Sequence, residues 1–471
     1  MFVLYSFLIS ACLAAIDLIY IKAYQLEGYK LKKYFDKAIR FKFAFGDKTF
    51  LHFTRRTIRL ILCDWMIKFC VFILLFGLIP NFWINFVLVF LIFIISPIFV
   101  MLSFLIALPI ENLIKNAYIS KAKKKLKNAK CKKIAITGSF GKTSTKDILY
   151  QILKEEFDVC ATPKSFNTPM GICKTILEDL KETDDFFVVE MGARNVGDIE
   201  FLAKFVGVDF AILTPIGNCH LETFGSLENI ENTKYELCKE AKCGVIFNGK
   251  SKSTMKLFER YHQKKYLVCD KNGYAFAKKQ KTTCDGSEFV LSLDGKEFLC
   301  KTELLGKSNI DNIVVAAAMA YLLGESLFNI KNGIEKLKPT PHRLELIKGQ
   351  VVNVIDDSYN SNLDGFKQAL EVLRCFEGKK IVVSPGIVEL GREQENMNFS
   401  VGLEVAKVAD IFIIMNETNK KSLQAGAKSG GMTEEQLMFA CTREQQKRLL
   451  RQVIGCGDVV LFENDLPDNF K

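Results

Sequence analysis

Three long apolar stretches near the N-terminus restrict the fold of this chain more than any other feature. They occupy residues 2–21, 60–79 and 82–110, and the third has no charged residue before Glu111. A helix needs about 20 residues to cross the roughly 30 Å hydrocarbon core of a bilayer. A small soluble domain could not bury so many uncharged residues, so the sequence predicts three transmembrane helices. The third stretch exceeds one span, so we expect it to tilt, bend near Pro97 or lie partly in the interface.

The distribution of Lys and Arg orients these helices. The chain has a net charge of +11, but residues 1–133 carry 21 Lys and Arg against 6 Asp and Glu, whereas the remaining residues carry 43 against 47 and are mildly acidic. Basic residues fill the 22–59 loop and recur as nine lysines between Lys115 and Lys133. Such segments stay cytoplasmic, and the lysine run can lie on anionic lipid headgroups. We therefore expect a multi-pass protein of the cytoplasmic membrane with a cytoplasmic body, and the acidic body gives no argument for a nucleic-acid partner.

Two charged residues interrupt the second apolar stretch. Asp64 and Lys68 are four residues apart, which places them on one face of a helix. We interpret them as a pair that snorkels to the membrane interface rather than as a proton relay.

From residue 134 the pattern changes to apolar strands that alternate with helical stretches. The expected strands are residues 133–137, 186–190, 210–213, 245–247, 351–355, 381–384, 411–415 and 459–462. Residues 265–305 have shorter alternating segments, which are typical of antiparallel strands. Strand–helix alternation indicates parallel sheets covered by helices on both faces. The sequence thus predicts an α/β protein with a membrane arm and basic linker at 1–133, a central domain at 134–338 and a C-terminal domain at 339–471.

The strongest functional motif follows the first of these strands. Residues 138–143 read GSFGKT and open a helical stretch. Backbone N–H groups in such a turn, together with the helix N-terminus, bind phosphate oxygens. Lys142 would neutralise the β- and γ-phosphates, and the Thr143 hydroxyl would reach Mg²⁺. The loop is two residues shorter than the common GxxxxGK[ST] form, but its setting between strand and helix predicts a nucleotide site.

Three more residues are candidates for the same site. Glu190 ends an apolar strand, where an acid beside a phosphate loop can hold Mg²⁺. His220 follows the end of the next strand, and Lys234 lies fourteen residues further along a helical stretch. Taken singly, each could equally be a helix-terminal acid, a surface imidazole or a solvated lysine.

Taken together, these segments resemble the Mur ligase family, the ATP-dependent amino-acid ligases of peptidoglycan precursor synthesis. The resemblance covers about residues 130–465 and rests on ITGSFGKTSTK, SFNTPMG, VVEMGA, HLETFGSLENI, KYEL, GKSNIDN, PHRLE, DDSYNSN and VELG, in the family's order. It is closest to the branch that adds D-alanyl-D-alanine to UDP-N-acetylmuramoyl-tripeptide. It implies a P-loop central ATPase domain followed by a Rossmann-like C-terminal domain.

The resemblance also implies roles for individual residues. Those that would bind ATP are Gly138, Ser139, Gly141, Lys142, Thr143, Ser144, Asn309, Asn312, Arg343 and Asp357, although Ser308 replaces the histidine usual in its motif. Two Mg²⁺ ions would be held by Thr143, Glu190, His220 and Lys234, the lysine as a carbamate. The catalytic set would be Lys142, His220, Lys234 and Arg343, and the substrate contacts Asn167, Thr168, Tyr359 and Asn360.

The implied reaction forms an amide through an acyl phosphate. ATP phosphorylates a carboxylate, and an amine then displaces phosphate. Three departures from the family bear on the acceptor. The membrane arm replaces the domain that binds the UDP end, ENDLPDNF replaces a Lys-Gly-Ser-Arg segment near the C-terminus, and Ser384-Pro-Gly-Ile replaces a Gly-Asp-Met type sequence.

Two alternatives therefore stay open. One is a membrane-anchored ligase that acts on another carboxylate, of poly-γ-glutamate type or lipid-linked. The other is a non-catalytic membrane scaffold that retains the ligase fold, against which the intact set of Lys142, Glu190, His220 and Lys234 argues.

Overall fold

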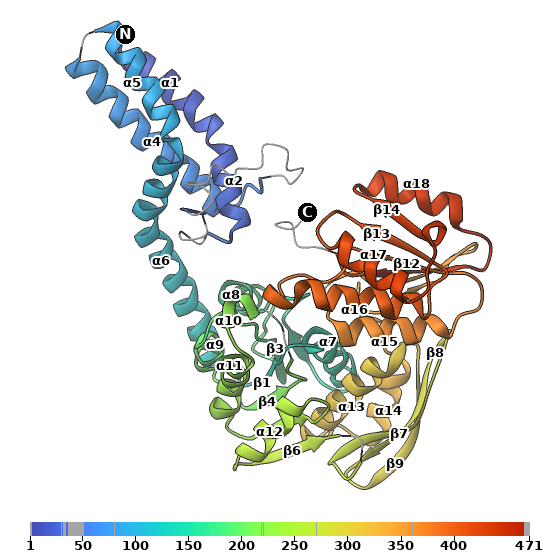
Figure 1. Ribbon diagram of the computed structural model, residues 1–471. Helices are drawn as coiled ribbons and strands as arrows, with labels where there is room; N and C mark the ends of the chain where they lie inside the picture. Colours follow the sequence, from blue (N-terminus) through green and yellow to red (C-terminus); the bar gives the residue numbers. More distant parts are fainter. Residues whose placement is uncertain are drawn as a thin grey trace. The chain divides into compact units, whose positions relative to one another are not determined.

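The chain is seen here in a computed structural model that describes residues 2–29, 31, 34–35, 51–79, 81–217, 219, 221–269, 271–359 and 361–465. These residues belong to two compact units (Figure 1). The described residues up to Tyr118 form the first unit, and those from Ile119 onward form the second.

Helices make up the described part of the N-terminal unit. They are α1 (Phe2–Ile16), α2 (Leu18–Leu26), α4 (Arg55–Leu78), α5 (Phe82–Ile94) and the first part of α6 (Ser96–Asn128). Among the described residues, three helices are long and apolar enough to cross a membrane, namely Val3–Leu26, Arg55–Leu78 and Ser96–Asn128. At 1.5 Å per residue, the 24 residues of α4 extend for roughly 36 Å. The number of long apolar helices agrees with the sequence prediction.

The third apolar stretch is divided between two helices. α5 ends at Ile94, and α6 begins at Ser96 with Pro97 in its first turn. Proline is well placed there, because its fixed φ suits a helix and its missing N–H would have no partner in the first turn. Of the three alternatives that the sequence left open, the structure shows a break next to Pro97, and the last long helix begins at residue 96 instead of 82.

A buried ionic cluster joins the helices of this unit. The Lys68 ammonium contacts the carboxylates of Asp17 and Asp64, and its distance to Asp64 Oδ2 is 2.6 Å. All three side chains are buried, and Ser103 Oγ donates to Asp64 Oδ1 at 3.2 Å. The interpretation of Asp64 and Lys68 as a snorkelling pair is therefore wrong. The lysine turns inward because Asp17 on the preceding helical segment supplies a second carboxylate.

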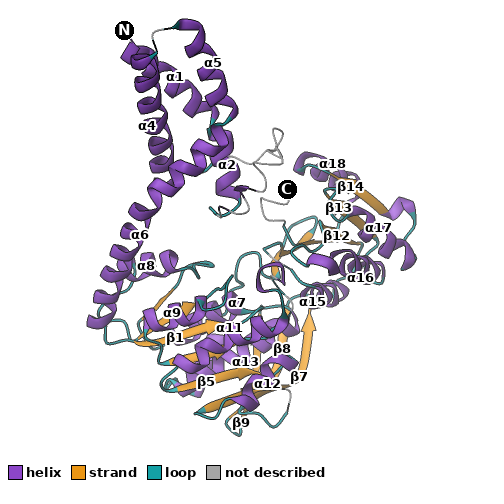
Figure 2. Ribbon diagram, turned by 60° about the vertical axis from the view of Figure 1, so that its left-hand side comes forward, coloured by secondary structure: helices purple, strands orange, loops and turns teal. Residues whose placement is uncertain are grey.

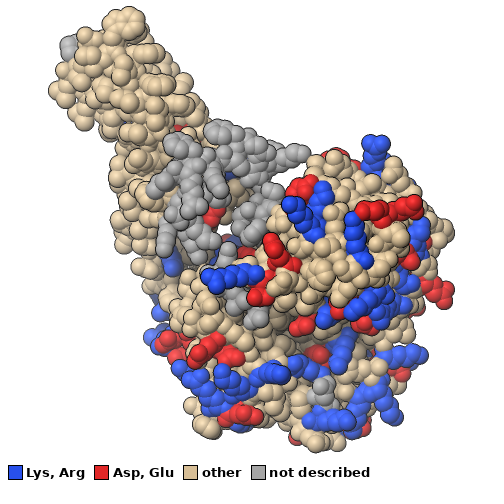
Figure 3. Space-filling view, in the orientation of Figure 1, with Lys and Arg blue, Asp and Glu red and all other residues tan. Residues whose placement is uncertain are grey.

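The outer surface of the same unit is apolar. Large side chains such as Phe82 and Trp83 are each 74% exposed. Figure 3 shows hardly any charged side chains over these helices, whereas both signs of charge are interspersed over the larger unit. A buried ionic cluster beneath an apolar exterior is an arrangement that suits a lipid environment.

In the described part of the larger unit, a nine-stranded sheet has the strand order β2-β3-β1-β4-β5-β6-β7-β8-β9. Its strands are β1 (Lys132–Thr137), β2 (Val159–Ala161), β3 (Phe186–Glu190), β4 (Phe210–Leu213), β5 (Gly244–Asn248), β6 (Lys265–Val268), β7 (Ala275–Thr283), β8 (Gly286–Leu293) and β9 (Lys296–Thr302). β2 to β7 pair in parallel, and β7, β8 and β9 pair antiparallel (Figure 2). The antiparallel strands expected within 265–305 are found in β7, β8 and β9, whereas β6, at the start of that range, pairs in parallel.

Helices cover both faces of this sheet. They are α7 (Lys142–Leu153), α8 (Pro169–Glu178), α9 (Asp198–Val206), α10 (Leu221–Phe224), α11 (Leu227–Glu240), α12 (Lys252–Arg260), α13 (Gly306–Leu322) and α14 (Leu327–Glu335). One core contains the end of α6 with α8, α9 and α11, and the other contains α7, α13 and α14. Residues 119–128 of α6, which the sequence assigned to the membrane arm and linker, thus pack against the central sheet.

A second sheet follows, with six strands in the described chain in the order β10-β11-β15-β12-β13-β14. The strands are β10 (Glu345–Ile347), β11 (Asn353–Asp357), β12 (Lys380–Ser384), β13 (Ile411–Met415), β14 (Leu437–Ala440) and β15 (Val459–Glu463), and the helices are α15 (Leu363–Arg374), α16 (Gln394–Ala406), α17 (Lys420–Ser429) and α18 (Arg443–Val453). Only β10 pairs antiparallel. The α/β prediction with a central and a C-terminal domain is confirmed.

Candidate functional site

A glycine-rich loop lies at the carboxyl edge of the central sheet, between the end of β1 at Thr137 and the start of α7 at Lys142. Gly138 and Gly141 have φ values of 150° and 76°. A Cβ atom on Gly138 would lie 2.0 Å from Thr214 Oγ1, and one on Gly141 would lie 2.6 Å from Asn312 Oδ1. Both positions therefore require glycine because the loop packs directly against its neighbours.

Hydrogen bonds hold the loop against the segment that follows β4. The N–H groups of Ser139 and Phe140 donate to the carbonyl of Pro215 at 2.9 and 3.3 Å, and Ser139 Oγ donates to the carbonyl of Gly217 at 3.1 Å. The first N–H groups of α7, from Lys142 onward, have no carbonyl partner within the helix. These are the donors suited to phosphate oxygens. The buried Ser144 follows in the same turn.

Lys142 folds back over this loop. Its ammonium donates to the carbonyls of Gly138 and Ser139 at 2.9 and 3.0 Å. Desolvation lowers the pKa of Lys142, and the nearby charge of Glu190 opposes that shift. Phosphate oxygens could replace both carbonyls as hydrogen-bond acceptors. The ammonium therefore already lies beside the point where phosphates would bind.

Glu190 connects three of the predicted site residues. Its buried carboxylate lies at the end of β3. Thr143 Oγ1 donates to Oε2 at 2.8 Å, and Asn167 Nδ2 donates to Oε1 at 3.0 Å. A candidate phosphate-loop residue, metal ligand and substrate contact are thereby brought together. Thr168, by contrast, is exposed and caps α8 by accepting from the Gly171 N–H at 3.3 Å.

Lys146 belongs to the same cluster, and sequence reasoning missed it. Its side chain is completely buried, with Nζ 3.2 Å from Asp147 Oδ1 and 4.0 Å from Glu190 Oε2. Nζ also donates to the carbonyl of Lys164. The signal was present, because a residue four positions after Lys142 lies on the same helix face. Lys146 links the start of α7 to the segment that carries Asn167.

Lys234 is buried on α11, a short way from the loop. Its pKa falls to about 8, chiefly because burial penalises the ammonium and secondarily because Lys142 is positively charged. No hydrogen bond or ion pair joins its ammonium to another described residue. An amine with this pKa is partly neutral near pH 7, and the neutral amine is the form that reacts with CO₂.

Two predicted site residues, His220 and Asn360, lie outside the described residues.

Two predicted nucleotide contacts, Asn309 and Asn312, are buried on α13. Asn312 Oδ1 accepts a hydrogen bond from Thr145 Oγ1 at 3.2 Å, and Asn309 Nδ2 donates to the carbonyl of Leu305 at 2.9 Å. α13 packs closely against α7. Asn312 therefore lies beside the loop and links α13 to α7, whereas the hydrogen bond of Asn309 goes to the residue that precedes α13.

Residues of the C-terminal domain reach the same region. The Arg343 guanidinium lies 4.1 Å from the centre of the Tyr359 ring. The Tyr359 hydroxyl donates to Ser165 Oγ, two residues before Asn167. The charge of Arg343 contributes to the lowered pKa of Lys142. The predicted ATP and substrate contacts of the second domain thus face those of the first.

A carboxyl pair lies beside Arg343. Asp357 and Glu463 are register partners at the ends of β11 and β15, and their carboxyl groups are close enough to shift each other's pKa. Burial raises the pKa of Asp357 to about 6 and that of Glu463 well above its usual range, and Arg343 lowers both. Ser361 Oγ donates to Glu463. Glu463 is the first residue of ENDLPDNF, so this departure from the family has a direct structural consequence.

Two family models match the chain. The Mur ligase middle domain matches residues 136–320, and the glutamate ligase domain of Mur ligases matches residues 342–463. The chain belongs to the Mur ligase family. The expected ATP-dependent ligase class is thereby confirmed, and neither model extends into the N-terminal unit.

Related proteins with known names belong to one branch of this family. UDP-N-acetylmuramoyl-tripeptide–D-alanyl-D-alanine ligase of Bacillus subtilis is 28% identical over 339 residues, which are 70% of this chain and 72% of that protein. The Escherichia coli enzyme of the same name is 29% identical over 314 residues, 63% of this chain and 66% of that protein. For the Mycobacterium tuberculosis enzyme the shared part falls to 48% of its length. The chain thus spans about half to three quarters of such relatives.

Solved structures of MurF ligases are similar to this chain in fold as well. The MurF ligase of Thermotoga maritima in complex with ADP superposes with a TM-score of 0.68 at 27% identity, covering 74% of this chain and 80% of that chain. MurF of Acinetobacter baumannii gives 0.68 at 25% identity, covering 74% and 77%.

Proposed function

We propose that this Mur ligase adds D-alanyl-D-alanine to UDP-N-acetylmuramoyl-tripeptide in peptidoglycan precursor synthesis, using ATP. The observation that carries the proposal is the convergence of Thr143 and Asn167 on the two oxygens of Glu190, at 2.8 and 3.0 Å. A phosphate-loop hydroxyl and a substrate-side amide then share one carboxylate. The names of the relatives from Bacillus subtilis and Escherichia coli supply the substrates.

The oxygen donors fit Mg²⁺. A hydroxyl and a carboxylate at the same point are hard ligands of the kind that Mg²⁺ prefers, so Thr143 and Glu190 would hold one ion. Lys234, as a carbamate, and His220 would hold a second. Bound Mg²⁺ would offset the charge between the ATP phosphates and the acceptor carboxylate.

Carbamoylation of Lys234 is consistent with its surroundings. The neutral amine attacks CO₂, an N–C bond forms, and one proton is released. The buried amine with a pKa of about 8 offers the neutral form at neutral pH. The modification replaces a poorly solvated cation by an anion that can bind metal.

The chain's own residues support the phosphorylation step. Lys142 and the first N–H groups of α7 would bind the transferred phosphate, and Arg343 would approach it from the C-terminal domain. Asn167 would orient the acceptor carboxylate. The contact between Tyr359 and Ser165 brings the two domains together, and closure there would keep water from the acyl phosphate until the amine attacks.

The proposal includes a location. The three long apolar helices and the basic segments that flank them support a multi-pass protein of the cytoplasmic membrane with its ligase domains in the cytoplasm. The division at 1–133, 134–338 and 339–471 belongs to the same proposal. The arm would keep the ligase close to the lipid-linked steps that follow.

The deciding experiment measures phosphate release by detergent-solubilised protein with ATP and Mg²⁺, with and without UDP-N-acetylmuramoyl-tripeptide and D-alanyl-D-alanine. Release that needs both substrates, together with an amide product by mass, supports the proposal. Release only with another acceptor refutes this substrate assignment.

A second candidate is a related ligase with a different acceptor, of poly-γ-glutamate type or lipid-linked. Glu463 favours it, because a buried carboxyl pair stands where the tripeptide-adding branch usually has a basic segment. The same phosphate assay with alternative carboxylates separates the two candidates.

A further inference from the structure

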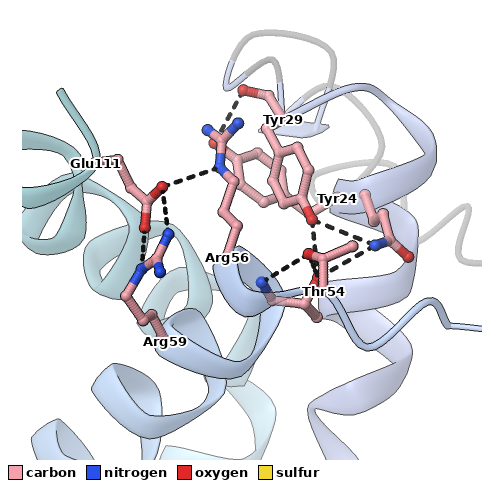
Figure 4. A network of polar contacts seen from close by, with 8 residues as sticks. Tyr24, Tyr29, Thr54, Arg56, Arg59 and Glu111 are labelled. Carbon is pink, nitrogen blue, oxygen red and sulfur yellow. Dashed lines mark hydrogen bonds and ion pairs between the residues drawn. The ribbon is translucent and has the colours of Figure 1, made fainter. Parts of the chain in front are cut away.

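Two arginines, Arg56 and Arg59, lie beside Glu111 at the basic end of the N-terminal unit (Figure 4). Arg59 forms a two-pronged contact with Glu111, with Nε at 2.6 Å and Nη2 at 3.0 Å from its two oxygens. Arg56 approaches the same carboxylate only to 4.0 Å. Because Arg59 engages both oxygens of Glu111 and no other described residue takes a hydrogen bond from Arg56, most donors of Arg56 are available to another acceptor.

Arg56 is held in a defined orientation. Its guanidinium lies 4.1 Å from the centre of the Tyr29 ring. The Tyr29 hydroxyl is 3.0 Å from Thr57 Oγ1 and 3.3 Å from Gln25 Nε2, and the ring meets the edge of Tyr24. A guanidinium stacked on an aromatic face keeps its in-plane N–H groups free for a planar pair of oxygens. The Tyr29 ring is thus a platform that holds the guanidinium of Arg56 in one orientation.

The site lies where lipid headgroups would be. Arg56 precedes the apolar stretch that begins at residue 60 by about one turn, and its side chain is 39% exposed. Arg55, Arg56 and Arg59 lie within the first five residues of α4, and Arg56 and Arg59 share the single carboxylate of Glu111. The local excess of positive charge favours an anionic partner.

We propose that Arg56, on its Tyr29 platform, binds the phosphate of an acidic phospholipid headgroup in the cytoplasmic leaflet. The inference rests on the proposed membrane location but not on the ligase reaction. It separates one defined lipid site from the diffuse attraction of the lysine run. The arm would then select its lipid surroundings as well as span the bilayer.

The test uses the full-length protein in nanodiscs of phosphatidylcholine with phosphatidylglycerol, released into native mass spectrometry to count retained lipids. Wild-type protein should retain phosphatidylglycerol in preference to phosphatidylcholine. Arg56→Gln should reduce that preference roughly fivefold, the effect of about 1 kcal/mol per basic residue at a charged surface. Tyr29→Leu should weaken retention although it removes no charge. Arg55→Gln, the matched control on the adjacent residue, should retain the lipid.

Equal losses in Arg55→Gln and Arg56→Gln, with Tyr29→Leu unchanged, would overturn the proposal in favour of diffuse charge attraction. Equal retention of both lipids by wild-type protein would also overturn it. Phosphate release measured on the same samples distinguishes this failure from failure of the ligase assignment. Extraction of the protein from membranes by alkaline carbonate would instead refute the membrane location.

Discussion

Lys146 Nζ lies 4.0 Å from Glu190 Oε2, and both side chains are buried where α7 meets the end of β3. Glu190 also accepts from Thr143 and Asn167. A single carboxylate therefore joins the phosphate loop, a second lysine and the substrate-side segment. A substitution of Lys146 should therefore affect both the phosphate loop and the substrate-side segment.

Lys146→Met should therefore impair catalysis more than binding of ATP. The buried carboxylate of Glu190 loses a cation and the Lys164 carbonyl loses its donor, so Asn167 is less well positioned. We expect kcat to fall about 10²-fold, the scale found when one preorganised electrostatic group is removed. Lys146→Arg should keep part of the activity that Lys146→Met loses. Lys174→Met, at an exposed lysine of α8, should leave kcat unchanged. Wild-type kcat and KM in a folded Lys146→Met protein would refute this role.

Lys142→Ala should abolish turnover and leave the fold intact. Among the described residues, the ammonium donates to the loop carbonyls of Gly138 and Ser139, so the change should remove a phosphate ligand without breaking a contact to the apolar core. We expect a decrease of at least about 10²-fold in phosphate release. Lys154→Ala at the end of α7 is the control, and circular dichroism checks the fold. If cells that depend on this protein grow normally with Lys142→Ala, the scaffold alternative gains the support that the ligase loses.

Lys234 should make activity depend on CO₂. The carbamate forms from the neutral amine, whose share falls about tenfold for each pH unit below the pKa of about 8. In CO₂-depleted buffer, activity should therefore decline as pH falls from 8 to 6.5, and bicarbonate should restore it. Carbon-13 NMR with labelled bicarbonate should show a carbamate that Lys234→Ala lacks and Lys239→Ala keeps. A full pH profile without CO₂ would exclude the modification.

The carboxyl pair should make stability decrease as pH rises. Burial raises the pKa values of Asp357 and Glu463, so the folded state binds more protons than the unfolded state above about pH 4. Stability from the protonated pair is complete below the unfolded pKa values and is lost as pH rises through the folded ones, the first of which is about 6.

Glu463→Gln tests this sign. An amide can still donate to Asp357 but carries no charge at any pH, so the variant should be more stable than wild type at pH 8 by about 1–3 kcal/mol, one pKa unit being ~1.4 kcal/mol. At pH 4 the difference should largely vanish. Denaturant unfolding of both proteins at the two pH values, with the exposed Glu377→Gln as control, measures it. A wild-type protein that gains stability between pH 5 and 8 relative to Glu463→Gln would contradict the assignment.

Part of this architecture could be read from the sequence because local patterns carry it. Apolar runs bounded by turns marked the long strands, and β3 and β1 brought Glu190 and Thr143 together because parallel strands end at a common edge. β2 has three residues, too few for a pattern. Asp17 and Lys68 are separated by 51 residues, and nothing local indicates that they pair. Packing between distant segments decided that contact.

The same pairing gives the last prediction. Lys68→Met leaves Asp17 and Asp64 buried without a cation, and breaking a buried ion pair in this way costs about 3–5 kcal/mol. Thermal unfolding in detergent should show a large loss for Lys68→Met and recovery in the triple variant with Asp17→Asn and Asp64→Asn, which removes every charge. If the triple variant is no more stable than Lys68→Met, the lysine acts through packing against Phe99 and not through the two carboxylates.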